Sequence, residues 1–221
     1  MSFLVSQLIK DGYLKSPQII EAFLKIDRSN FVPKELKEFA QEDRPLPIGF
    51  GQTISQPCVV AFMLELLQPQ PGEKILDIGS GSGWTSTLLA EIVSKENKKG
   101  KVIAIEIIPE LVKLGKENAK KYNFVKKGVI KFILGDGKRG YEKETPFDKI
   151  LVSASATKIK NKGIENVPPN LKKQLKIGGK IVIPIGESIW LFIKKDEENF
   201  EEKETPGFIF VPLISSPPKF K

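Results

Sequence analysis

The sequence contains no histidine, and Cys58 is the single cysteine among its 221 residues. Without imidazole, the Ser-His-Asp and Cys-His nucleophile systems and the common histidine-ligated zinc sites are excluded. One cysteine cannot form an intramolecular disulfide or a cysteine-based metal cage within the chain. We therefore expect no metal, and any catalysis has to proceed without a histidine base.

The chain also lacks an apolar stretch approaching the roughly 18 residues that would span a bilayer. Residues 1–10 hold only a short apolar run, without the basic region and small-residue cleavage site of a signal peptide. Hydrophobic residues make up 40% of the sequence and charged residues 28%, the balance of an ordinary globular protein. We expect a cytoplasmic monomer that has no membrane partner.

The net charge of +8 raises the question of a nucleic-acid partner. The lysines are scattered, with pairs at 98–99 and 172–173. The sequence has no stripe of arginine and aromatic residues of the kind that would indicate a nucleic-acid surface. Nucleic-acid binding is therefore the less favoured interpretation of the charge.

The order of predicted elements indicates an α/β fold. Ser16 and Pro17 are typical of a helix start, and three prolines and two glycines predict an extended loop over residues 44–57. Helical spacing returns over 59–67, and after residue 69 short apolar strands alternate with helices, as in a parallel sheet. Strands are expected at 74–78, 101–105, 129–134, 148–153, 180–184, 189–194 and 207–213; helices are expected at 84–93, 109–122 and 169–175. An acidic turn is expected at 196–204.

A glycine-rich turn follows the first of these strands. Gly79, Gly81 and Gly83 allow the backbone to turn tightly and to approach a ligand closely. Their G-x-G-x-G spacing differs from the G-x-G-x-x-G dinucleotide fingerprint, which disfavours an NAD dehydrogenase. Asp77 precedes the first glycine and suits a ligand with a positive charge, such as the amino group of S-adenosylmethionine.

Carboxylates follow the next two strands. Glu106 lies about 20 residues beyond the glycine turn, where a carboxylate can accept hydrogen bonds from both ribose hydroxyls. Asp136 lies between Gly135 and Gly137 at the end of the third strand, where we expect adenine. Each residue alone could be a solvated strand end or a turn residue that bonds its own backbone. Because they fall at successive strand ends in the order a nucleoside needs, together they predict S-adenosylmethionine as cofactor.

The loop at 45–57, Pro-Leu-Pro-Ile-Gly-Phe-Gly-Gln-Thr-Ile-Ser-Gln-Pro, resembles the hallmark segment of the protein-L-isoaspartate O-methyltransferases. We call it the substrate loop. Further similar segments lie at 28–33, 42–44, 135–137, 146–148, 174–175, 178–179, 183–186 and 210–213, so that the resemblance covers roughly residues 5–213.

The resemblance implies one compact domain, with an N-terminal helical segment and the substrate loop in residues 1–68 and the core with C-terminal strands in 69–221. The core is expected to be a Rossmann-like S-adenosylmethionine-dependent methyltransferase fold, a mostly parallel twisted sheet with helices on both faces. The implied activity is protein repair: methyl transfer to the free carboxylate of L-isoaspartyl, or D-aspartyl, residues in damaged proteins and peptides.

The resemblance also implies roles for individual residues. Ser55 takes the position of the catalytic serine. Cofactor-binding positions, taken together with the residues above, are Gln52, Thr53, Ile54, Ser55, Asp77, Gly79, Gly81, Ser82, Glu106, Ile107, Asp136 and Gly137. Substrate-binding positions are Ile48, Gly49, Thr53, Ser55 and Val211. Since a carboxylate is already ionised at neutral pH, it needs no general base, and Ser55 need only orient it.

Some positions depart from the family pattern. Residues 153–157 precede a lysine-rich stretch at 158–166, which puts the shape of the active-site rim in question. Ile214 stands where some members have a cofactor-contacting threonine, and Val60 where one has histidine, so these contacts are not expected here.

Alternatives to this activity remain open from the sequence. One is a homologue that binds the cofactor without transferring the methyl group, and another is an RNA methyltransferase, suggested by the positive charge. Pro57-Cys58 superficially matches the Pro-Cys nucleophile of cytosine methyltransferases, but it precedes the glycine turn. We expect Cys58 to be a core residue instead.

Overall fold

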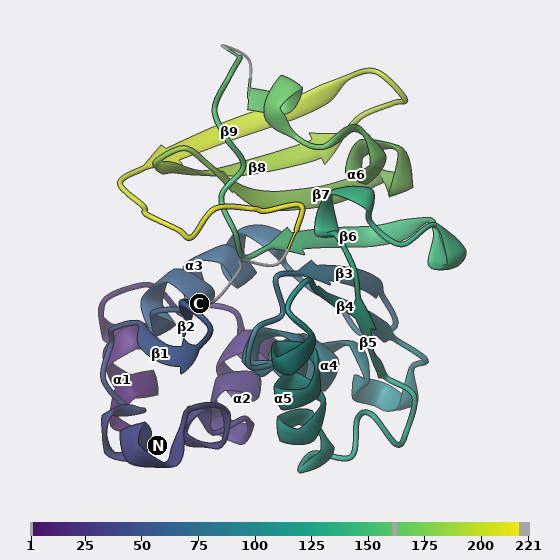
Figure 1. The fold of residues 1–221 in the computed structure, drawn as a ribbon. Helices are drawn as coiled ribbons and strands as arrows, with labels where there is room; N and C mark the ends of the chain where they lie inside the picture. Colours follow the sequence, from purple (N-terminus) through teal and green to yellow (C-terminus); the bar gives the residue numbers. More distant parts are fainter. Residues whose placement is uncertain (1, 161–162, 217–221) are drawn as a thin grey trace.

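The computed structural model describes residues 2–160 and 163–216, and its centre is a seven-stranded sheet in the order β5-β4-β3-β6-β7-β8-β9 (Figure 1). The strands are β3 (Lys74–Ile78), β4 (Lys101–Glu106), β5 (Ile130–Leu134), β6 (Phe147–Val152), β7 (Leu175–Ile185), β8 (Ser188–Lys194) and β9 (Phe200–Pro206). The first five run parallel, whereas β8 and β9 are antiparallel additions. Because the chain moves outward from β3 to β5 and then returns beside β3 as β6, the strand order reverses at the centre of the sheet.

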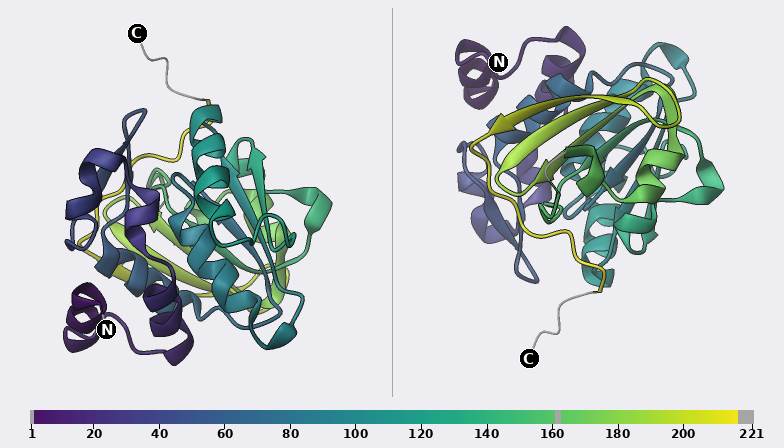
Figure 2. Two further views of the ribbon diagram at one scale, coloured as in Figure 1. Left: turned by 90° about the horizontal axis from the view of Figure 1, so that it is seen from below. Right: turned by 90° about the horizontal axis from the view of Figure 1, so that it is seen from above.

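Helices cover both faces of this sheet. The α-helices are α1 (Phe3–Lys10), α2 (Pro17–Lys25), α3 (Pro57–Leu67), α4 (Trp84–Val93), α5 (Pro109–Lys120) and α6 (Pro169–Gln174). Short 3-10 helices are η1 (Arg28–Phe31), η2 (Lys34–Phe39), η3 (Lys95–Asn97), η4 (Gly137–Arg139), η5 (Glu142–Glu144) and η6 (Gly163–Asn166). Figure 2 shows α2, α4 and α5 side by side over one face, while α6 lies on the other.

The strands supply alternate side chains to two hydrophobic cores. Ile75 packs under the helices α1 to α5, whereas its neighbour Leu76 packs toward α6 on the opposite face. Val102 and Ile103 divide in the same way, as expected when successive side chains of a strand point to opposite faces. Both faces of the central strands are therefore buried. This arrangement confirms the predicted α/β fold with a mostly parallel sheet and helices on both faces.

The substrate loop folds as a hairpin rather than as an extended loop. Strand β1 (Leu46–Gly49) pairs antiparallel with β2 (Gln52–Ile54), with Leu46 opposite Ile54. Phe50 and Gly51 join them, and both have positive φ angles, of 55° and 64°. A type I′ turn, whose twist matches that of a hairpin, requires positive φ at both central residues, and these two residues meet that requirement.

The expected strand at 207–213 is wrong, and the expected acidic turn at 196–204 is confirmed only over 196–199, because β9 begins at Phe200. The last strand is β9, which pairs along its whole length with β8, from Ser188 opposite Pro206 to Lys194 opposite Phe200. Its charged residues, Glu201 to Glu204, are exposed because β9 is the edge of the sheet, where charges discourage pairing with another chain. Residues 207–214 instead cross back toward β6, held by hydrogen bonds between Ser155 and both Val211 and Leu213.

No helix within residues 2–160 and 163–216 is both long and apolar enough to cross a membrane.

Candidate active site

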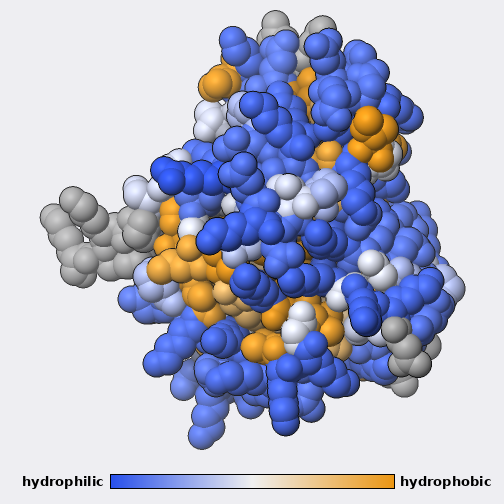
Figure 3. Space-filling model, turned by 90° about the vertical axis from the view of Figure 1, so that its right-hand side faces the viewer, coloured by the Kyte–Doolittle hydropathy of each residue, from blue (hydrophilic) through white to orange (hydrophobic). Residues whose placement is uncertain are grey.

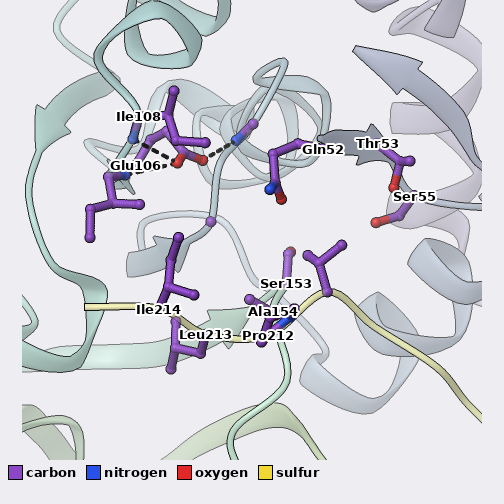
Figure 4. Close-up of a pocket in the computed structure, with 14 residues that line it drawn as sticks. Gln52, Thr53, Ser55, Glu106, Ile108, Ser153, Ala154, Pro212, Leu213 and Ile214 are labelled. Atoms are coloured by element: carbon purple, nitrogen blue, oxygen red, sulfur yellow. Dashed lines mark hydrogen bonds between the residues drawn. The ribbon is translucent and has the colours of Figure 1, made fainter. Parts of the chain in front are cut away.

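The carboxyl ends of β3, β4 and β6 meet at one pocket (Figure 4). Ile78, the last residue of β3, pairs with Ile105 on one side and Val152 on the other, so that Gly79, Glu106 and Ser153 follow side by side. This is the point where the strand order reverses, the usual place for a ligand in an open α/β sheet. The lining residues are Gln52, Thr53, Ser55, Gly79, Gly81, Glu106, Ile107, Ile108, Ser153, Ala154, Val211, Pro212, Leu213 and Ile214.

Glu106 is held in place by three backbone amides. One carboxylate oxygen accepts hydrogen bonds from Ile107 and Ile108 at 2.8 and 3.1 Å, and the other accepts from Gly81 at 2.9 Å. An ionised carboxylate has about four acceptor positions. One position therefore stays available to the pocket, and binding both hydroxyls of a ribose requires sharing or releasing one of the three amides.

The glycine turn itself has no room for side chains at its closest contacts. Gly83 has φ of +84°, and a Cβ there would lie 2.9 Å from the Cα of Gly115 in α5. A Cβ on Gly81, where φ is +49°, would lie 3.3 Å from Cδ1 of Ile48. The turn thus brings α4 against α5 and leaves bare backbone facing the pocket at Gly79 and Gly81.

Asp77 lies beneath this turn and outside the pocket lining. Its carboxylate is fully buried, and one oxygen accepts a hydrogen bond from the Ser86 hydroxyl at 2.5 Å. The other oxygen has no hydrogen-bond partner within the described residues. Burial raises the pKa of Asp77 to about 7, the Ser86 hydrogen bond opposes this rise, and the nearby charge of Glu106 adds to it. Direct contact between Asp77 and a ligand amino group stays a prediction.

Ser55 faces the pocket from the side opposite Glu106. Figure 4 shows the hydroxyls of Thr53 and Ser55 close together on the strand β2 side, with the Ser55 oxygen directed into the pocket. Gln52 also lines the pocket, whereas the side chain of Ile54 is buried in the core. The structure therefore brings Ser55 and Glu106 together around one space, although they lie far apart in the sequence.

Other predicted site residues lie apart from this pocket. Asp136 accepts a hydrogen bond from the backbone N–H of Lys138 at 2.9 Å and so caps η4. A Cβ on Gly137 would lie 2.2 Å from Cγ2 of Ile78, so this glycine is required for packing. Ile48 is buried against the glycine turn, while Gly49 is exposed at the hairpin and Ser82 borders a smaller adjoining pocket. Their cofactor and substrate contacts stay predictions.

Six lining residues were absent from the sequence prediction: Ile108, Ser153, Ala154, Pro212, Leu213 and Ile214. Ser153 and Ala154 directly follow β6, so the rule that ligands meet the carboxyl ends of strands could have identified them. Pro212 and Leu213 carry no local signal, because they reach the pocket only through the return of the chain after β9. Ile214 was set aside because it replaces the threonine of some family members, yet it lines the pocket. In the stretch 153–166, whose effect on the rim was in question, residues 161 and 162 lie outside the described residues.

Apolar side chains lie beside Glu106 at the pocket. Leu134 is 56% exposed at the end of β5, where it pairs with Glu106 in β4, and Ile107 and Ile214 line the pocket itself. Figure 3 shows one large apolar patch near the middle of a mainly hydrophilic face, with smaller apolar spots above it. A flat aromatic base next to a ribose on Glu106 would find apolar side chains on which to pack.

Cys58 is confirmed as a core residue. Its side chain is buried near the start of α3, and burial together with the neighbouring Asp43 carboxylate raises the pKa of the thiol to about 12. A protonated, buried thiol is not a nucleophile at neutral pH. This disfavours the Pro-Cys interpretation that would make the protein a cytosine methyltransferase.

Comparison with known proteins places these features in context. A family model described as protein-L-isoaspartate(D-aspartate) O-methyltransferase matches residues 1–217. A protein-L-isoaspartate O-methyltransferase of Methanopyrus kandleri is 43% identical over 215 residues, covering 96% of this chain and 89% of the relative. One from Aeropyrum pernix is also 43% identical, over 96% of this chain and 78% of its own.

A solved structure shares the whole fold. It is a Plasmodium falciparum protein described as a protein-L-isoaspartate O-methyltransferase, in complex with S-adenosyl-L-homocysteine. It superposes with a TM-score of 0.82 at 28% identity and covers 96% of this chain and 97% of its own. The fold similarity therefore extends over nearly the whole of both chains.

Proposed function

Because this chain belongs to the protein-L-isoaspartate(D-aspartate) O-methyltransferase family, we propose that it methylates the free carboxylate of L-isoaspartyl residues in damaged proteins and peptides. The observation that carries the proposal is the pocket that joins the glycine turn and Glu106 on one side to Ser55 on the other. The match confirms the family resemblance seen in the sequence. The S-adenosyl-L-homocysteine bound by the Plasmodium protein supports S-adenosylmethionine as cofactor.

The residues of the pocket fit this cofactor. Backbone without side chains at Gly79 and Gly81 leaves space at the end of β3, and Glu106 retains an acceptor position for a ribose hydroxyl. Ile107 and Ile214 supply apolar contacts suited to an adenine base. Asp77 is buried with one unpartnered oxygen and its pKa is raised to about 7, so it adds negative charge beneath the turn when it is ionised, and a cationic ligand would favour that ionised form. When bound, S-adenosylmethionine supplies a methyl group on a positively charged sulfur.

The chain needs to position the acceptor rather than activate it. An isoaspartyl carboxylate is ionised at neutral pH, so the absence of histidine from the sequence is no obstacle to the reaction. The Ser55 hydroxyl can donate a hydrogen bond that orients this carboxylate, with Thr53 beside it. Correct alignment of two reacting groups can supply roughly 7–11 kcal/mol of barrier reduction. Ser55 is therefore assigned an orienting role, not that of a nucleophile.

The proposal also covers the substrates, the oligomeric state and the cellular location of the enzyme. The enzyme acts on isoaspartyl proteins and peptides, accepts D-aspartyl sites as its family name implies, and works as a monomer in the cytoplasm without a metal, membrane or nucleic-acid partner. Sedimentation of the purified protein tests the monomer, and fractionation of cells tests the location.

The activity is tested with radiolabelled S-adenosylmethionine and two peptides that differ only in an isoaspartyl or a normal aspartyl linkage. We expect label in the isoaspartyl peptide alone. Equal labelling of both peptides would refute the proposed specificity. Labelling of transfer RNA but of neither peptide would favour the RNA methyltransferase alternative, and cofactor binding without any transfer would favour an inactive homologue.

A further inference from the structure

Arg28 is a buried charge that the reaction outlined above does not use. Only 2% of the residue is exposed, and its guanidinium donates to four backbone carbonyls. One terminal nitrogen donates to Ala40 at 3.1 Å and Glu42 at 3.2 Å, and the other donates to Arg44 at 2.8 Å and Ser55 at 3.1 Å. A buried ion is costly unless it is well bonded. The four hydrogen bonds to backbone carbonyls offset this cost and fix the segments that carry them.

One of these contacts lies directly at the pocket. The carbonyl oxygen that Arg28 holds belongs to Ser55, the residue whose hydroxyl faces the proposed substrate. The guanidinium carbon also lies 5.4 Å from the ring centroid of Trp84, the first residue of α4 after the glycine turn. A single side chain therefore contacts both the substrate loop and the start of the helix that follows the proposed cofactor turn.

Asp43 fixes the backbone on the other side of Ser55. One of its carboxylate oxygens accepts from the backbone N–H of Cys58 at 2.8 Å, and the other accepts from the Gln56 side chain at 3.2 Å. Helix α3 begins at Pro57, and its N-cap residue, Gln56, makes no side-chain capping bond of its own. Asp43 thus caps α3 from a distant part of the chain, as an acceptor at a helix N-terminus does.

We propose that Arg28 and Asp43 form a clamp that positions Ser55 for methyl transfer. Arg28 holds the Ser55 carbonyl, Asp43 holds the residues that follow, and the contact with Trp84 sets this loop relative to the glycine turn. This inference rests on the proposed function. Neither side chain touches the reacting atoms, so both are positioning residues whose loss lowers the rate of transfer more than the affinity for the cofactor.

The test compares Arg28→Lys with a matched buried cation elsewhere. Lys194 is also 2% exposed and donates to the carbonyls of Lys172 and Leu175 at 3.3 and 3.2 Å near the end of α6, outside the pocket. Lys194→Met is therefore expected to lower the melting temperature with kcat kept within about twofold of wild type. Arg28→Lys retains the charge but not the planar fork that serves four carbonyls.

We expect Arg28→Lys to lower kcat with the isoaspartyl peptide by roughly 10- to 100-fold, the size of effect known for small misplacements near a reacting centre. The dissociation constant for S-adenosyl-L-homocysteine, measured by calorimetry, is expected to change by less than about threefold. Amide hydrogen exchange over residues 52–56 should accelerate in Arg28→Lys but not in Lys194→Met. Asp43→Asn should show the same pattern with a smaller loss of kcat.

Unchanged kcat and unchanged exchange over residues 52–56 in Arg28→Lys would overturn the clamp, as would a loss of cofactor affinity equal to the loss of kcat. If Arg28→Lys fails to fold, Asp43→Asn decides: wild-type kcat in that variant refutes the proposal. Failure of the proposed function is recognised separately, because the wild-type protein would then not methylate the isoaspartyl peptide. The exchange comparison would still show whether Arg28 orders the loop.

Discussion

At the scale of single residues, the hydroxyl of Ser55 is the group that we place closest to the acceptor carboxylate. Ser55→Ala removes one hydrogen bond to a charged group, worth about 1.5–3 kcal/mol. We therefore expect kcat with an isoaspartyl peptide to fall by roughly 10- to 100-fold. Affinity for S-adenosyl-L-homocysteine should stay within about twofold, because cofactor binding rests mainly on the other wall of the pocket.

Ser94→Ala is the matched control for this change. The Ser94 hydroxyl bonds the carbonyl of Ala90 at the end of α4 and lies outside the pocket lining, so its loss should leave kcat unaltered. Steady-state methylation assays and calorimetry on both variants decide the matter. A Ser55→Ala enzyme with the wild-type rate would remove Ser55 from the mechanism.

The buried carboxyl of Asp77 links stability to pH. Its pKa rises from 3.8 to about 7 on folding, so between these values the unfolded chain loses a proton that the folded protein keeps. The free energy of unfolding therefore falls as pH increases from about 4 to 7, by an amount on the order of 4 kcal/mol, and the loss is complete above pH 7.

Asp77→Asn lacks this titration, so we expect it to gain stability relative to the wild type as pH rises. The difference in unfolding free energy between the two cofactor-free proteins, from urea titrations at pH 4 and pH 8, measures the effect. A difference that does not change with pH would show that Asp77 is ionised in the folded protein throughout.

At the scale of elements, the contact between α4 and α5 depends on two glycines. Gly83→Ala forces an alanine into positive φ and places its Cβ against Gly115. Gly128→Ala is a suitable control, because φ there is +72° but no atom lies within 4 Å of the added Cβ. We expect both variants to lose stability through backbone strain, and Gly83→Ala to lose on the order of 1–3 kcal/mol more through overpacking.

Thermal or urea unfolding of the two glycine variants measures this difference. Gly83→Ala should also weaken cofactor binding, since the glycine turn has to move to admit the Cβ. Equal stabilities would mean that α4 and α5 separate without cost.

Elements buried on both faces were predictable from the sequence, whereas the edge of the sheet was not. The strands β3 and β6 are short, almost fully buried segments in which isoleucine, leucine and valine predominate, and the glycine turn follows β3 directly. Strand β9 is mostly exposed and charged, so that its composition suggested a turn even though its backbone pairs fully with β8. The start of β7 was missed for a related reason, because Gly178 and Gly179 interrupt its apolar pattern.

The site, like the sheet, was predictable only where its residues follow strands that the sequence reveals. Its local parts, the residues after β3 and β4, could be placed because their strands could be recognised. Ser55 was identified through the family resemblance rather than through spacing. Leu213 was missed because a single sequence gives no sign that the chain crosses back over the sheet after β9, and Ile214 was set aside because it lacks the threonine hydroxyl found in some family members.

At the scale of the whole molecule, binding in the pocket should stabilise the entire fold. The pocket joins the N-terminal segment, the sheet and the C-terminal segment, so a ligand there binds only the folded state. S-adenosyl-L-homocysteine at about 100 times its dissociation constant adds about 2.7 kcal/mol of stability. For a chain of this size we expect the melting temperature to rise by roughly 5–10 °C.

Differential scanning fluorimetry measures this shift, with NAD as the matched negative control because the glycine spacing disfavours a dinucleotide. Glu106→Ala should reduce the shift strongly. A larger shift with NAD than with S-adenosyl-L-homocysteine would contradict the assignment of the cofactor.

The return of the chain after β9 also has a consequence for the newly made protein. The walls of the pocket are contributed by residues from Gln52 to Ile214, so the sheet can assemble during synthesis while one wall is still missing. Full occupancy of the pocket becomes possible only after Ile214 has left the ribosome. Acquisition of the cofactor is therefore expected to follow the synthesis and docking of the segment after β9, rather than the assembly of the sheet alone.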